Sequence, residues 1–178
     1  GADGLIQRMG EQELTQLFRQ YGELSQAHRA ARALRKAIDE EGAEGIASTH
    51  RLQSILAPLA PPQKRNQYLA QAFQALRIAV NDELGALSDL LKSSLQLLKP
   101  SGRLVVISYH SLEDRMVKRF MRAGNMEGEI AKDFHGRSLA PFDKVTGKAI
   151  VADAMEMERN PRSRSARMRI AARNTLAA

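Results

Sequence analysis

Residues 102–122 read GRLVVISYHSLEDRMVKRFMR, and the pattern changes in the middle of this segment. A turn signal, Pro100-Ser101-Gly102, precedes a short apolar run rich in β-branched residues, which predicts a buried strand over 103–108. From Ser111 onward, a capping residue, two acids and helically spaced apolar residues predict a helix. Residues 108–111 therefore lie where a strand ends and a helix begins. Open α/β sheets bind their ligands at such carboxyl ends of strands.

The longest regular pattern precedes this strand. Its apolar residues repeat at spacings of three and four: Phe73, Leu76, Val80, Leu84, Leu87, Leu91, Leu95 and Leu98. This spacing predicts one long amphipathic helix that continues through Asn81. The alternative is a break at Asn81-Asp82-Glu83, which also reads as a cap followed by acids in a first turn. A Lys-Pro-Ser-Gly turn ends the pattern, so helix, turn and strand would form half of a right-handed crossover unit.

The N-terminal third of the chain predicts three short helices. They cover residues 11–20, Ser25 (as the N-cap) to about Glu41, and Thr49 (as the cap) to Pro58. Short helices bury little apolar surface on their own, so we expect them to pack as one helical subdomain over residues 1–65. Residues 66–178 then form the second domain.

The segment after Arg122 is less regular. Scattered glycines and charges predict loop over 123–147, then a short strand at 148–151 and a helical turn at 153–159. In the last predicted strand, 166–172, arginines alternate with apolar residues, which indicates one solvent-exposed basic face.

The composition narrows the classes of function. A net charge of +7 and a pI near 10.0 favour an acidic partner, nucleic acid first, although they also suit plain solubility. Only 4% of the residues are aromatic, which argues against a stacking platform for single strands. The absence of cysteine excludes disulfides and thiolate metal sites and fits a reducing, cytoplasmic location. No apolar run approaches the length needed to span a bilayer, so no membrane partner is expected.

Three segments resemble one known family. They are the strand-to-helix segment already quoted, residues 73–84 (FQALRIAVNDEL) and residues 160–170 (NPRSRSARMRI). Together they resemble the RsmH (MraW) family of bacterial S-adenosylmethionine-dependent methyltransferases, which modify the exocyclic amine of a cytidine in small-subunit ribosomal RNA. The resemblance implies an α/β fold with a partial Rossmann-like class I methyltransferase sheet, a helical insertion subdomain on the substrate side, and ribosomal RNA as partner.

The resemblance also assigns candidate site residues. Those on the catalytic side are Asn81, Ser108, His110 and Ser111. Those on the substrate-binding side are Arg77, Tyr109, Asp114 and Arg115. Arg162, Arg164 and Arg167 join them on a different ground: they belong to a basic stripe whose arginines, interspersed with serines, suit phosphate contact, namely Arg159, Arg162, Arg164, Arg167, Arg169 and Arg173. Methyl transfer to an exocyclic amine needs an unstacked base and acceptors for the amine protons, which Asn, His and Ser can supply. Without the resemblance, a histidine that ties down the turn, and arginines on a solvated strand edge, explain the same residues.

One expected element is absent from the sequence. Methyltransferases of this architecture hold their cofactor on a glycine-rich turn after a strand, but the glycine pairs 42/45 and 124/128 follow predicted helices. We therefore expect a C-terminal portion without cofactor-binding or metal-binding residues, inactive on its own and unable to bind S-adenosylmethionine. We also expect self-association through an unpaired edge of strand 103–108. The alternative function is a non-enzymatic, basic helical RNA-binding module.

Overall fold

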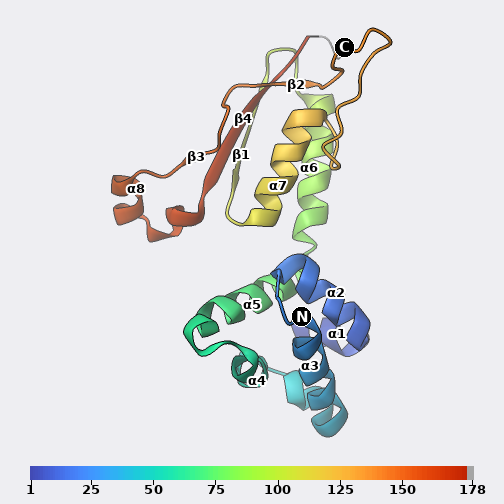
Figure 1. Ribbon diagram of the computed structural model, residues 1–178, viewed down its shortest axis with the longest axis vertical. Coiled ribbons are helices and arrows are strands. Elements are labelled where there is room, and N and C mark those ends of the chain that lie inside the picture. Colours follow the sequence, from blue (N-terminus) through green and yellow to red (C-terminus); the bar gives the residue numbers. More distant parts are fainter. Residues whose placement is uncertain (176–178) are drawn as a thin grey trace. The chain divides into compact units, whose positions relative to one another are not determined.

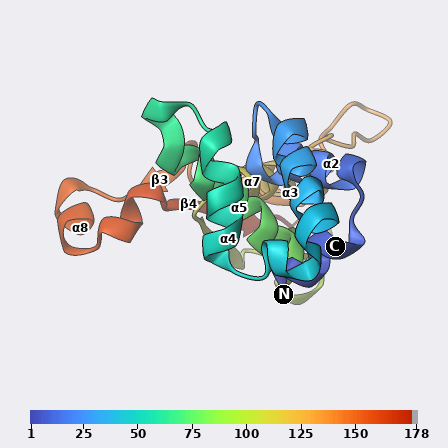
Figure 2. The same cartoon turned by 90° about the horizontal axis from the view of Figure 1, so that it is seen from below.

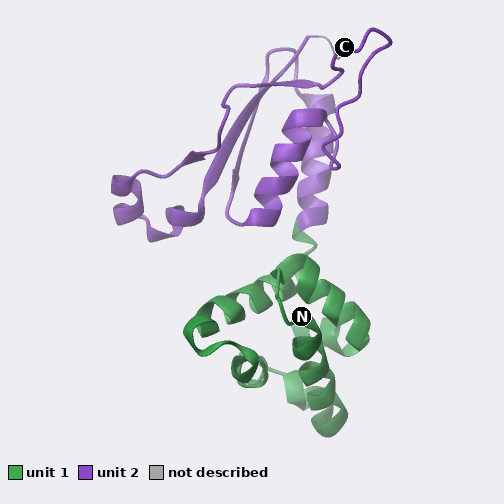
Figure 3. Ribbon diagram, viewed as in Figure 1, with its two compact units in different colours: residues 1–83 green, residues 84–178 purple. Residues whose placement is uncertain are grey.

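The computed structural model describes residues 1–175, which form two compact units: unit 1, residues 1–83, and unit 2, the described residues from 84 onward (Figure 3). The chain divides into these units between Glu83 and Leu84, whereas the sequence predicts a domain boundary after residue 65. Within the described residues, no helix combines the length and the apolar character needed to cross a membrane.

Unit 1 is entirely helical. Its α-helices are α1 (Ala2–Arg8), α2 (Glu11–Gly22), α3 (Ala27–Glu41), α4 (Thr49–Leu56) and α5 (Arg65–Asn81), with 3-10 turns η1 (Gly42–Ile46), η2 (Ala57–Leu59) and η3 (Pro62–Lys64). Helix α2 packs against α3 and α5, and α2 and α3 lie side by side in both Figure 1 and Figure 2. The core that they enclose contains fully buried Leu14, Phe18, Leu34 and Leu56. The three predicted short helices are confirmed, although Gln26 and Ser48, rather than Ser25 and Thr49, occupy the N-cap positions of α3 and α4.

The prediction of one long helix through Asn81 is wrong. Helix α5 ends at Asn81, Asp82 adopts a left-handed conformation (φ 48°), and α6 (Glu83–Leu97) begins at the next residue. Aspartate tolerates this conformation better than most residues, and the acidic Glu83 suits the first turn of a helix. The two halves of the apolar stripe pack into different cores: Leu76 belongs to the core of unit 1 and Leu91 to that of unit 2.

Unit 2 places helices beside a small antiparallel sheet. Its elements after α6 are β1 (Arg103–Ser108), α7 (Ser111–Ala123), β2 (Phe142–Lys144), β3 (Ile150–Val151), α8 (Ala154–Arg159), η4 (Pro161–Ser165) and β4 (Arg167–Arg173). Strand β4 pairs with β1 on one side and with β2 and β3 on the other, all antiparallel. Helix α7 lies against β1 and β4 (Figure 1), and buried Val117, Phe120 and Phe142 form the core with Leu91. The strand at 103–108, the helix after it and the C-terminal strand are thus confirmed as elements. The prediction that 103–108 is a buried strand is wrong for one of its faces, and β2 falls in a segment predicted as loop.

The faces of β4 differ from the prediction that its arginine face is exposed to solvent. Leu104 and Val106 of β1 face the core of unit 2, and the register places Ala171 and Arg169 of β4 opposite them. The arginine face of β4 is therefore turned toward α7 and is not simply a solvent-exposed face. On the other face, Val105 and Ile107 are 51% and 53% exposed, beside Ile170 and Met168. Within residues 1–175, β4 is the only strand that pairs with β1, so β1 has one unpaired edge.

Candidate functional site

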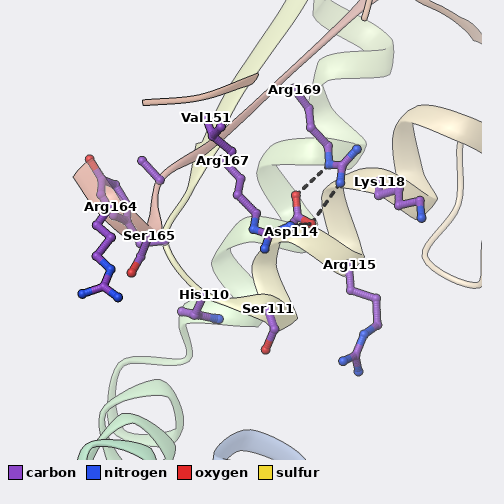
Figure 4. A pocket seen from close by; sticks show the side chains of 12 residues that line it. His110, Ser111, Asp114, Arg115, Lys118, Val151, Arg164, Ser165, Arg167 and Arg169 are labelled. Carbon is purple, nitrogen blue, oxygen red and sulfur yellow. Dashed lines mark hydrogen bonds and ion pairs between the residues drawn. The ribbon is translucent and has the colours of Figure 1, made fainter. Parts of the chain in front are cut away.

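A cavity of about 610 Å³ lies in unit 2, at the junction between the end of β1 and the start of α7. It is lined by Tyr109, His110, Ser111, Asp114, Arg115, Lys118, Val151, Arg164, Ser165, Ala166, Arg167 and Arg169. These residues come from the β1–α7 junction, α7, β3, η4 and β4, and Figure 4 shows their side chains around the cavity. Five cationic side chains face one carboxylate, so the cavity is suited to an anionic ligand.

His110 forms the N-cap of α7. Its Nδ1 accepts a hydrogen bond from the backbone N–H of Glu113 (3.3 Å), and the Glu113 carboxylate accepts from the backbone N–H groups of Tyr109 (2.9 Å) and His110 (3.4 Å). This is a capping box in which histidine stands where serine or threonine is usual. An accepting Nδ1 carries no proton, so the neutral ring has its proton on Nε2, which lies 3.2 Å from Oε1 of Glu113. The contact with the His110 ring is the main reason that the pKa of Glu113 lies below its ordinary value.

Asp114 is the one carboxylate in the cavity wall. It accepts two hydrogen bonds from Arg169, 2.7 Å from Nε and 2.9 Å from Nη2, and both side chains are largely buried, 13% and 16% exposed. This bidentate hydrogen bonding to Arg169 is the largest cause of the lowered pKa of Asp114. Arg167 lies farther away, with Nη1 4.0 Å from the carboxylate, and its side chain is 57% exposed. The carboxylate thus fixes one arginine and leaves a second accessible (Figure 4).

The cavity gathers most of the substrate-side residues that the sequence analysis named. Tyr109, Asp114, Arg115, Arg164 and Arg167 line it, as do His110 and Ser111, whereas exposed Arg162 does not. Ser108 is buried, and its hydroxyl donates to the backbone carbonyl of Arg167 (3.3 Å), which ties the end of β1 to the start of β4. The roles of all these residues stay predictions.

Arg77 and Asn81 belong to unit 1. Both side chains donate to the Glu83 carboxylate: Arg77 through Nε (2.9 Å) and Nη2 (3.1 Å), and Asn81 through Nδ2 (3.2 Å). The amide oxygen of Asn81 is not used in this contact. That Asn81 and His110 serve one common crevice stays a prediction.

Sequence reasoning missed Lys118 and Ser165 as parts of the cavity wall, and it named Arg169 only as a member of the basic stripe. The spacing from Asp114 to Lys118, four residues on a predicted helix, places both on one face and was a usable signal. Arg169 alternates with Arg167 along β4, so the period of two also indicated a shared face. The pairing of Arg169 with Asp114, 55 residues earlier, has no sequence signal because it depends on tertiary structure.

Comparison with known proteins identifies relatives along nearly the whole chain. The sequence profile of the MraW methylase family matches residues 1–174. A protein from Amoebophilus asiaticus named ribosomal RNA small subunit methyltransferase H is 53% identical over 175 residues, 98% of this chain and 56% of that protein. Proteins of the same name from Cytophaga hutchinsonii and Parabacteroides distasonis are 48% and 45% identical over 97% and 96% of the chain. The chain spans about half the length of these relatives.

Proposed function

Because the chain belongs to the MraW methylase family, we propose that it is part of an S-adenosylmethionine-dependent methyltransferase of small-subunit ribosomal RNA, which modifies the exocyclic amine of a cytidine. The proposal includes a cytoplasmic location, a Rossmann-like sheet to which β1 and β4 contribute, and a substrate-side role for the helical unit. The names of the relatives support the reaction class, and the +7 charge of the chain suits an RNA partner.

The observation that supports this function best is the basic cavity at the carboxyl end of β1. Arginine and lysine side chains from three elements meet there, and such groups bind phosphate oxygens of nucleic acids. The position also matches the place where α/β sheets bind their ligands. In this proposal the cavity holds the RNA strand near the nucleotide to be methylated.

The same cavity does not fit the methyl donor. S-adenosylmethionine carries a positively charged sulfonium, and five cationic side chains with one carboxylate would repel it. β1 ends at Ser108 and is followed by Tyr109-His110-Ser111, not by a glycine-rich turn. We therefore assign no described residue to the cofactor.

The exocyclic amine of the cytidine needs a hydrogen-bond acceptor, and we look for it among the side chains that still have acceptor lone pairs. Nδ1 of His110 is used by the cap of α7 and its Nε2 carries the proton, so the neutral ring has no nitrogen available to accept. The amide oxygen of Asn81 and the hydroxyl of Ser108 act only through their donor groups in the contacts described above and retain acceptor lone pairs. In this proposal His110 holds the strand-to-helix turn in shape, and the amide oxygen of Asn81 or the hydroxyl of Ser108 accepts a hydrogen bond from the exocyclic amine and so orients it.

A chimaera tests the proposal. In the Amoebophilus asiaticus relative, the matching 56% is replaced by this chain, and small-subunit RNA is treated with the chimaera and radiolabelled S-adenosylmethionine. Digestion to nucleosides and mass spectrometry should show cytidine methylated on its exocyclic amine. A chimaera that folds and binds RNA, but yields no methylated cytidine while the parent does, would contradict the proposal. That result would favour a non-enzymatic RNA-binding module, which the names of the relatives do not favour.

A further inference from the structure

We propose that the cavity of unit 2 binds one phosphodiester group of an RNA strand between Arg164 and Arg167, and that the Asp114–Arg169 ion pair positions Arg167 for this contact. The inference rests on the proposed function, since it takes RNA as the partner. Of the four arginines that line the cavity, it assigns a structural role to Arg169 and a binding role to Arg164 and Arg167.

Arg169 is the structural one. Two of its guanidinium nitrogens donate to the two carboxylate oxygens of Asp114, at 2.7 and 2.9 Å. Its side chain is only 16% exposed, so little of it can reach a ligand. Because a bidentate arginine–carboxylate pair is geometrically restrictive, it fixes the centre of β4 relative to α7.

Arg167 is placed by this pair. It lies two residues before Arg169 in β4, so both side chains project from the same face of the strand. Asp114 attracts its guanidinium, but at 4.0 Å and with both oxygens already bonded to Arg169 the carboxylate does not satisfy it. The backbone carbonyl of Arg167 is also held, by the hydroxyl of Ser108. Arg167 therefore has a fixed backbone and a directed, accessible side chain.

Arg164 approaches from a different element. It is exposed on η4, and Figure 4 shows it on the side of the cavity away from Arg169. An anion between Arg164 and Arg167 would have a cation on either side, with Ser111 and Ser165 in the same wall. Tyr109, 55% exposed, and Val151, 62% exposed, also line the cavity and offer apolar surface to a sugar or base. This mixture suits a nucleotide strand better than a free phosphate ion.

The test uses a substitution with opposite expectations. Asp114→Asn adds one positive charge to the cavity, so pure electrostatics expects tighter RNA binding. If Asp114 positions Arg167, binding should instead weaken, by about tenfold for one lost charge-assisted hydrogen bond. The control, Asp143→Asn, makes the same charge change at an exposed site on β2 that does not line the cavity.

The assay is fluorescence anisotropy of a short labelled single-stranded RNA over a salt series, with this chain. Removing one phosphate contact should flatten the slope of log affinity against log salt by about 0.7. We expect this loss in Arg167→Gln and in Asp114→Asn, and no further loss when the two are combined, because the carboxylate acts through Arg167. Arg164→Gln should flatten the slope independently. Exposed Arg103 and Arg137, each changed to Gln, match these variants in charge and do not line the cavity.

A second measurement keeps the test decisive if Asp114→Asn does not fold. RNA strands in which one phosphate is replaced by a neutral methylphosphonate are bound to the wild-type chain and to Arg167→Gln. At one position in the strand, the methylphosphonate should weaken RNA binding by the wild-type chain and leave RNA binding by Arg167→Gln unchanged. The inference is overturned if no position behaves so, if Asp114→Asn binds as tightly as Asp143→Asn, or if S-adenosylmethionine displaces the RNA. Competition by inorganic phosphate as strong as that by RNA would also overturn it, in favour of a free-anion site.

The two proposals fail separately. Loss of methyl transfer in the chimaera, with phosphate-dependent RNA binding intact, rejects the enzyme and keeps the binding site. Methyl transfer that is unaffected by Arg164→Gln and Arg167→Gln rejects the binding site and keeps the enzyme.

Discussion

Gly124→Ala should destabilise unit 2 by about 2–4 kcal/mol. Gly124 ends α7 in the left-handed region (φ +81°), and its N–H donates to the carbonyl of Phe120 at 2.7 Å. A side chain in this conformation costs about 1 kcal/mol. A Cβ would also lie 2.5 Å from Cγ and 2.6 Å from Cδ of Pro141, the residue before the buried Phe142. Overpacking of this kind adds about 1–3 kcal/mol, because the proline ring cannot turn away without moving β2.

Gly136→Ala is the matched control. Gly136 has nearly the same φ, +80°, but a Cβ there would meet no atom within 4 Å. Only the conformational cost of about 1 kcal/mol should remain. Urea unfolding followed by circular dichroism measures both variants. Equal losses in the two variants would refute the packing of Pro141 against Gly124 as the origin of the larger effect.

Three further predictions concern the site and the sheet. His110→Ala should lower the free energy of unfolding by about 1 kcal/mol and His110→Asn by less, since asparagine is a good N-cap; equal losses by urea unfolding would contradict the capping role. The folded protein lowers the pKa of Glu113 below its ordinary value of 4.5 and the pKa of Asp114 below its ordinary value of 3.8. Each carboxylate therefore stabilises the fold at a pH above its ordinary pKa, and this contribution is lost as the pH falls through its lowered pKa. Stability should therefore fall on acidification and fall less in Asp114→Asn, which an acid titration by circular dichroism checks. The unpaired edge of β1 should promote self-association, which Val105→Lys should reduce and Val145→Lys should not; sedimentation equilibrium showing a monomer, or no difference between the variants, would oppose it.

Local patterns were enough for the elements that frame the site. The turn before residue 103, the apolar strand and the acids after Ser111 are short-range signals, and the structure has β1 and α7 there. The N-cap was assigned to Ser111 because serine is the commoner cap, yet His110 takes this position. The ring nitrogen of His110 accepts the hydrogen bond that a serine hydroxyl would accept at an N-cap. N-cap preferences therefore favoured Ser111 over His110, and this order is wrong here.

The remaining errors concern tertiary structure. A period of two showed that β4 has an arginine face and an apolar face, but it could not show which one α7 would cover. The choice depends on Asp114, which draws Arg169 inward. The three residues of β2 become a strand by pairing with β4, and three residues are too few for a periodic signal. The helical spacing of apolar residues likewise continues past Asp82, although α5 ends at Asn81. This spacing cannot show that the apolar residues before and after Asp82 pack into different cores.

The left-handed Asp82 has a consequence for cooperativity. Among the described residues, the buried clusters on either side of it share no member, so no hydrophobic contact within one cluster depends on the other being formed. We therefore expect unit 1 and unit 2 to unfold in two separate transitions on heating. The calorimetric enthalpy of each transition should be smaller than that of a single cooperative unit of 178 residues. A substitution in one cluster would shift one transition and leave the other in place.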